Sequence, residues 1–118
     1  MIAALLSALA LQASTGLPNS IPGQADIQCV VTAMRLATAS ETHRVSSTVM
    51  MFYFIGKART QINDVELRDA VSRENSALAG EEARRAGERC SSEMSQVSAI
   101  FSGLSSDARA GRLSVSPE

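Results

Sequence analysis

The longest regular pattern in the chain is a stripe of apolar and small side chains over residues 81–105. Successive members of the stripe are three or four positions apart, which is the spacing of one face of an α-helix. They are Ala83, Ala86, Cys90, Met94, Val97, Phe101 and Leu104. Glu81 and Glu82 stand at the start, where carboxylates complement the positive end of a helix dipole. The pattern predicts a long helix near the C-terminus and favours an all-α fold.

Two shorter patterns predict further helices. Apolar residues over 24–39 follow helical spacing, and Asp26 is the expected N-cap because its short side chain is a good acceptor. Asn63 and Glu66 have the spacing of a capping box, and the helix that they open is expected to stop at Gly80. Together with the run described next, these segments predict a small all-α domain of four or five helices, packed as a bundle or orthogonally.

The most apolar part of the chain is VMMFYFI at residues 49–55, followed by Gly56. It holds three of the protein's four aromatic residues. A β-strand is a competing interpretation, because short apolar runs are ambiguous and these residue types favour strands. Helical spacing that begins at Val45, and the lack of a second strand to pair with, favour a helix.

A helix that is apolar on every side has to be covered on every side. Either this run is the central helix, surrounded by the other three, or part of it faces a partner protein. A small bundle seldom encloses one helix completely, and methionine and aromatic residues are enriched at interfaces. Gly56 is expected to permit the close approach of another helix. The predicted partner-binding residues are Val49, Met50, Met51, Phe52, Tyr53, Phe54 and Gly56.

The first residues, MIAALLSALALQAS, carry no charged side chain. Residues 2–11 are too few to span a bilayer, which takes about 20, but have the length of the apolar part of a signal peptide. An ordinary buried N-terminal helix is the alternative. We expect a periplasmic or secreted protein without a membrane span. Its expected parts are a signal peptide (1–13) cut after Ala13, a linker (14–23), a helical domain (24–106) and a flexible tail (107–118).

Cys29 and Cys90 are the two cysteines of the chain. In an oxidising compartment, two cysteines in a small domain usually pair, and closing a loop of this length contributes about 4 kcal/mol in the chain-entropy model. Two buried free thiols are the alternative. A metal site would have too few ligands, because His43 is the one histidine. We predict a disulfide between Cys29 and Cys90 that joins the first helix to the last.

No pattern in the sequence indicates catalysis. His43 lies in a polar turn and is expected to be a solvated surface residue, and the charged residues near Glu81 fit a helix start. There is no phosphate-binding, haem-attachment or EF-hand motif. The net charge of -1 argues against nucleic-acid binding. We therefore expect a protein that is not an enzyme, with no cofactor, metal, small-molecule substrate or nucleic-acid partner.

The layout resembles two groups of exported proteins. Cys29 near the start of the first helix, the apolar central run and Cys90 on a late helix resemble the periplasmic acid-stress chaperones of the HdeA type. The peptides Asp26-Ile27-Gln28-Cys29 and Tyr53-Phe54-Ile55-Gly56 resemble motifs of small exported two-cysteine proteins of alphaproteobacteria, which have no assigned activity. The first resemblance implies a dimer that opens in acid.

These observations lead to two expected functions. In the first, the chain is a non-enzymatic exported protein that binds other proteins as a stress chaperone of the HdeA kind. In the second, it is a structural or accessory subunit of a homo-oligomer, most simply a dimer, or of a larger envelope-associated complex.

Overall fold

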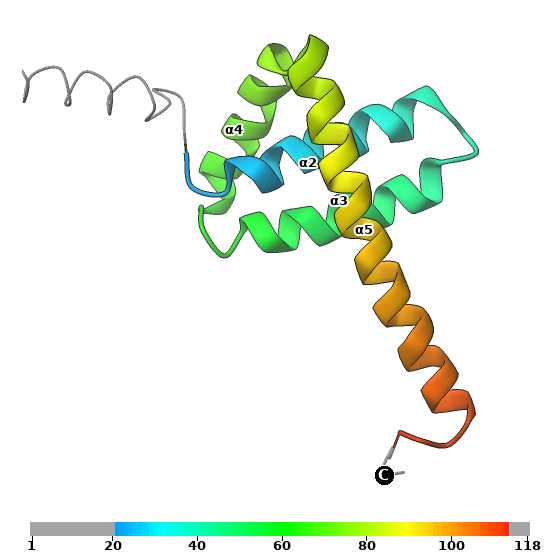
Figure 1. The fold of residues 1–118 in the computed structure, drawn as a ribbon. Coiled ribbons are helices and arrows are strands. Elements are labelled where there is room, and N and C mark those ends of the chain that lie inside the picture. The colour runs from blue at the N-terminus through cyan, green and yellow to red at the C-terminus, as the bar shows by residue number, and fades with distance from the viewer. Residues whose placement is uncertain (1–20, 114–118) are drawn as a thin grey trace, which may run out of the picture.

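The computed structural model describes residues 21–113, which form four helices and no strand (Figure 1). The helices are α2 (Gln24–Ala39), α3 (Arg44–Ala58), α4 (Asp64–Ala77) and α5 (Gly80–Arg109). The predicted all-α class is thereby confirmed. The signal peptide, most of the linker and the end of the tail lie outside the described residues, so the division of the chain into parts stays a prediction. Helix α5 continues slightly past the limit of 106 expected for the domain.

The start of α2 differs from the prediction in its capping residue. Gly23, with a φ of 75°, precedes the helix and no side chain caps it. Asp26 lies within the first turn instead, and its carboxylate pairs with the Lys57 ammonium at 3.1 Å. The N-cap prediction for Asp26 is therefore wrong, because this short acceptor is taken by a charged partner on α3.

The connection between α4 and α5 is also only partly as expected. Asn63 caps α4 as predicted, since its side-chain oxygen accepts a hydrogen bond from the Glu66 amide at 2.8 Å. The helix ends at Ala77, however, and Gly80, with a φ of 57°, opens α5 rather than stopping α4. The physical reason is Leu78, which leaves the helix to bury its side chain beside Val31.

The central helix of the domain is α2, which packs against α3, α4 and α5. Its first turns are buried on nearly all sides. The buried members are Asp26, Ile27, Gln28, Cys29, Val30, Val31 and Ala33. Of the two alternatives for the apolar run of α3, complete enclosure by the other helices is therefore wrong. The difference is that three helices pack on α2, whereas α3 packs chiefly on α2.

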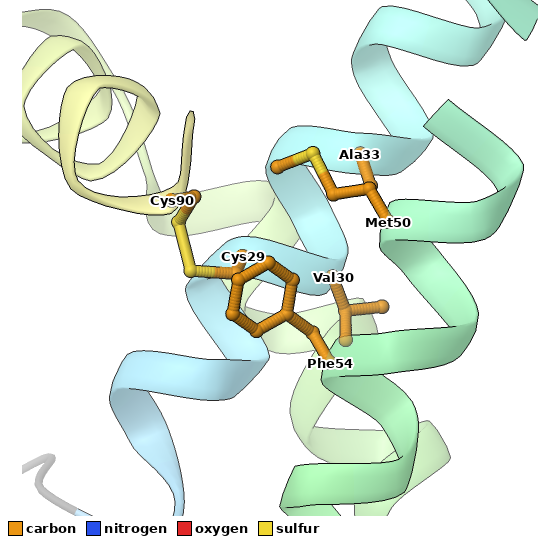
Figure 2. Close-up of a cluster of buried hydrophobic side chains, with 6 residues drawn as sticks. All are labelled: Cys29, Val30, Ala33, Met50, Phe54 and Cys90. Carbon is orange, nitrogen blue, oxygen red and sulfur yellow. A yellow bond between two sulfur atoms is a disulfide. The ribbon is translucent and has the colours of Figure 1, made fainter. Parts of the chain in front are cut away.

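The predicted disulfide is present at the centre of the core (Figure 2). The Cα atoms of Cys29 and Cys90 are 5.5 Å apart, and both residues are buried against Met50 and Phe54 of α3. The bond fixes the crossing of α5 over α2. A disulfide of this kind fits a compartment outside the reducing cytosol.

Only the first half of α5 is packed on the domain. Ala86 and Cys90 are buried, and Met94 is half-buried against the core. Beyond this point α5 runs away from the other helices, as Figure 1 shows. We call residues 97–109 the arm. Over the described part of the chain, no helix combines the length and apolar character needed to cross a bilayer.

Candidate protein-binding surface

Helix α3 has an inward face and an opposite face that are both apolar. Phe54 on the inward side is fully buried, and Figure 2 shows it against the disulfide. On the other side, Val45, Val49 and Phe52 are 77%, 57% and 71% exposed. Phe52 and Phe54 are separated by about 200° around the helix, which places them on opposite sides. We call Val45, Val49, Phe52 and Gly56 the outward face of α3.

The seven predicted partner-binding residues fall into three groups. Met50 and Phe54 are part of the core, so in this conformation they are not accessible to a partner. Met51 and Tyr53 are half-buried at the two edges of α3. The exposed members are Val49, Phe52 and Gly56.

Two details of the outward face were not predicted. Val45 extends it by one turn, and helical spacing was the signal that could have included it. No helix of the described chain approaches Gly56, where an added Cβ atom would meet nothing within 4 Å. The close approach expected at Gly56 is therefore not made within the described chain, and this position is open to an incoming helix.

The outward face also lacks charge. No charged residue occurs between Arg44 and Lys57. An ordinary surface helix carries polar and charged side chains on its solvent side. Single exposed apolar residues are common, but a contiguous group marks an interaction site or an aggregation liability. The outward face is a contiguous group of this kind.

A cluster of charged and polar groups borders the outward face. The Lys57 ammonium lies 2.5 Å from Oε2 of Glu93 and 3.1 Å from Oδ1 of Asp26. The Tyr53 hydroxyl donates a hydrogen bond to the same Glu93 oxygen at 2.8 Å. The cluster therefore joins α2, α3 and α5 at one point. Sequence reasoning missed it, although Lys57 is the one lysine of the chain.

The ionisation of this cluster indicates a structural role. The hydrogen bond from Lys57 holds the pKa of the Glu93 carboxyl below its usual value. The same bond raises the pKa of Lys57, and the hydrogen bond to Glu93 raises the pKa of Tyr53. At neutral pH the carboxylate and the ammonium are both charged, so the cluster clamps the helices together.

A groove of about 580 Å³ lies between α2, α3 and α4, along the edge of α3 that carries Met51 and Ile55. Apolar side chains from all three helices form most of its lining. These are Val30, Met34, Met51, Ile55, Leu67 and Val71. His43 is not part of this lining; it is exposed, and its Nδ1 is 3.2 Å from the Ser40 hydroxyl. The described residues contain no group of three or more His, Cys, Asp or Glu side chains that could hold a metal ion.

Comparison of the chain with protein-family models, with curated proteins and with solved structures finds no match. The resemblance to the HdeA-type chaperones and to the small exported proteins therefore stays a prediction. What can be inferred about function comes from the geometry of the chain itself.

Proposed function

We propose that this chain is a non-enzymatic protein of an exported compartment, periplasmic or secreted, that binds other proteins through the outward face of α3. The observation that carries the proposal is the exposure of Val45, Val49 and Phe52 on a helix whose opposite side already completes the core. These side chains add nothing to the packing of the domain. Phe52 is the expected anchor, because large aromatic residues dominate the energy of binding at interfaces.

The size of the outward face limits what it does alone. Burying one large apolar side chain contributes about 1.5–3 kcal/mol, and association itself costs at least about 4 kcal/mol. Three side chains therefore offset little more than the cost of association. Binding through this face is either transient, as for a stress chaperone, or part of a wider contact, as for a subunit of an assembly.

A site-specific crosslinker tests the proposal. A photoreactive phenylalanine analogue replaces Phe52 in the full chain, and the control carries it at Val65, an 81% exposed position on α4. After illumination of intact cells, we expect protein adducts from position 52 and few from position 65. One discrete adduct would indicate a permanent partner, whereas many adducts that increase in acid would indicate a chaperone. Equal or absent crosslinking at the two positions would overturn the proposal.

A further inference from the structure

The arm of α5 is the second apolar surface that the described chain leaves uncovered. Ile100, Phe101 and Leu104 are 63%, 70% and 50% exposed. Phe101 and Leu104 continue the stripe that packs on the core through Cys90 and Met94, and Ile100 lies beside it. The same side of α5 is therefore covered in its first half and bare in its second. No charged residue occurs between Glu93 and Asp107.

The arm extends the packed half of α5 and has little helix stability of its own. A helical segment shorter than about 12–15 residues is marginal in water even for alanine-rich sequences. The arm contains several serines and Gly103, which have lower helix propensity than alanine. A partner that packs against the bare stripe would therefore stabilise the arm as a helix.

The arm matches the outward face of α3 in length and in end charges. Basic residues stand at the two ends of the face, Arg44 at one and Lys57 and Arg59 at the other. The acidic residues Glu93 and Asp107 flank the uncharged run of α5 that contains most of the arm. At 1.5 Å per residue, Arg44 and Lys57 are about 20 Å apart along α3, and Glu93 and Asp107 are about 21 Å apart along α5. Residues 45–56 of α3 and 94–106 of α5 carry no charge, so the two surfaces are complementary in either direction.

The two surfaces do not meet within one chain. Phe52 is 71% exposed and Phe101 is 70% exposed, so neither covers the other. Figure 1 shows the reason: α5 crosses α3 and then leads the arm away from the domain. A contact between arm and outward face therefore requires two chains.

We propose that the arm of one copy of this chain docks on the outward face of α3 of a second copy. This inference rests on the proposed function, and it names the partner of the same surface. Phe101 packs between Val49 and Phe52 of the other copy, and Gly56 allows the arm to approach the helix backbone closely. If two copies exchange arms, both contacts form in one closed pair. Otherwise the head-to-tail contact adds copies until the assembly closes as a ring, and either closure increases the buried area.

The end charges set the register of this contact. Arg44 now pairs with Glu41 at 2.5 Å, and Arg59 pairs with Asp64 at 2.9 Å. On the arm, Asp107 pairs with Arg112 at 2.8 Å, whereas Glu93, which precedes the arm, stays in its cluster with Lys57. The exposed ion pairs of Arg44, Arg59 and Asp107 contribute little to stability. Sharing or exchanging them across the contact is therefore inexpensive, whereas a shifted register would leave charges against apolar side chains.

Two variants and their mixture test the inference with the full chain. Phe52→Asp disables the face, Phe101→Asp disables the arm, and Val65→Asp is the control. Light scattering and sedimentation over a range of concentrations measure self-association. We expect the wild type and the control to self-associate and each of the other variants to do so at least about 30-fold more weakly, as for an anchor residue. We also expect an equimolar mixture of the two weakened variants to form a one-to-one complex, because one intact arm and one intact face remain.

Each other outcome overturns the inference in a recognisable way. Loss of self-association only with Phe101→Asp would mean that arms pair with arms, and loss only with Phe52→Asp would mean that faces pair with faces. A wild type that stays monomeric, or a mixture that fails to combine, would also overturn it. Val49→Asp and Leu104→Asp repeat the test should either phenylalanine variant lose its helical circular dichroism. The crosslinker at position 52 decides the proposed function separately, because it reports any protein partner.

Discussion

Helices α2 and α3 lie side by side, yet the less apolar of the two is the centre of the domain. Helix α3 carries VMMFYFI and still exposes Phe52, whereas α2 buries the polar Asp26 and Gln28 within its first turns. The difference teaches that the number of helices that reach an element decides its burial. Apolar character alone places α3 against the core on one side and leaves its other side to water or to a partner.

Hydrogen bonds made by a buried polar side chain allow α2 to occupy the central position. Gln28 is buried, and its side-chain amide donates to the carboxylates of Glu74 at 3.0 Å and Glu82 at 3.2 Å. Its carbonyl oxygen accepts from Arg89 at 3.1 Å. A buried polar group without partners would cost a few kcal/mol, whereas here the same group links α2 to α4 and α5. The following changes test how far this contrast between α2 and α3 holds.

The largest expected effect is removal of the disulfide that fixes α5 on α2. The change is the double variant Cys29→Ala and Cys90→Ala, with alanine because a buried hydroxyl without a partner would add its own cost. For a bond across 61 positions, the chain-entropy model gives a loss of about 4 kcal/mol in the free energy of unfolding. Urea unfolding followed by circular dichroism measures it. A loss below about 1 kcal/mol would mean that packing alone holds α5 on α2.

A matched pair of phenylalanines compares the two sides of α3. Phe54→Ala removes a fully buried ring and is expected to cost about 3–5 kcal/mol. Phe52→Ala removes an exposed ring and is expected to change the free energy of unfolding by no more than about 0.5 kcal/mol. Urea unfolding at a concentration where the chain is monomeric measures both changes in the free energy of unfolding. Similar losses for the two variants would contradict the division of α3 into an inward and an outward face.

Gln28→Leu tests the hydrogen bonds that link α2 to α4 and α5. It keeps the volume of the side chain but removes three hydrogen bonds to charged groups. We expect a loss of about 1–2 kcal/mol, because the partners at the rim regain water. Gln96→Leu on the exposed part of α5 serves as the control and should change little. An increase in stability for Gln28→Leu would show that α2 owes its central position to apolar packing only.

The smallest effect concerns the charged cluster between α2, α3 and α5. Because the folded-state pKa of Glu93 is lowered, its contribution is present above its ordinary pKa of 4.5 and is lost as pH falls through the lower folded value. Stability should therefore fall in acid, and by less in Glu93→Gln than in the wild type. Urea unfolding at neutral pH and near pH 3 measures the difference.

The carboxylate variant Asp69→Asn, on the exposed surface of α4, is the control for this acid effect. It should keep the acid dependence of the wild type, since Asp69 lies outside the cluster. A Glu93→Gln variant with the same acid dependence as Asp69→Asn would contradict a stabilising role for the cluster.

Local patterns in the sequence predicted the elements well. Periodicity placed α2 over Gln24–Ala39, and the capping spacing placed the start of α4 at Asn63, because both signals depend on neighbours within a few residues. The disulfide was predicted from the cysteine pair and the expected compartment. The way in which α2 begins was not predicted, because Asp26 pairs with Lys57, which is distant in sequence.

The position of the core could not be predicted in the same way. The stripe on α5 is regular from Ala83 to Leu104, so nothing in it marks the point near Met94 where the core ends. The outward face of α3 has the same difficulty, because Phe52 and Phe54 are chemically identical and only the neighbouring helices distinguish them. Which apolar residues are free for binding is decided by tertiary packing.

The most direct test of the central claim measures the exposure of Phe52 in two settings. Hydroxyl-radical footprinting with mass spectrometry compares Phe52 and Phe54 in the dilute purified chain and in intact cells that express it. If the outward face is a protein-binding surface, Phe52 reacts readily in the dilute monomer and is protected in cells, while Phe54 is protected in both. Equal reactivity of Phe52 in the two settings would contradict the claim.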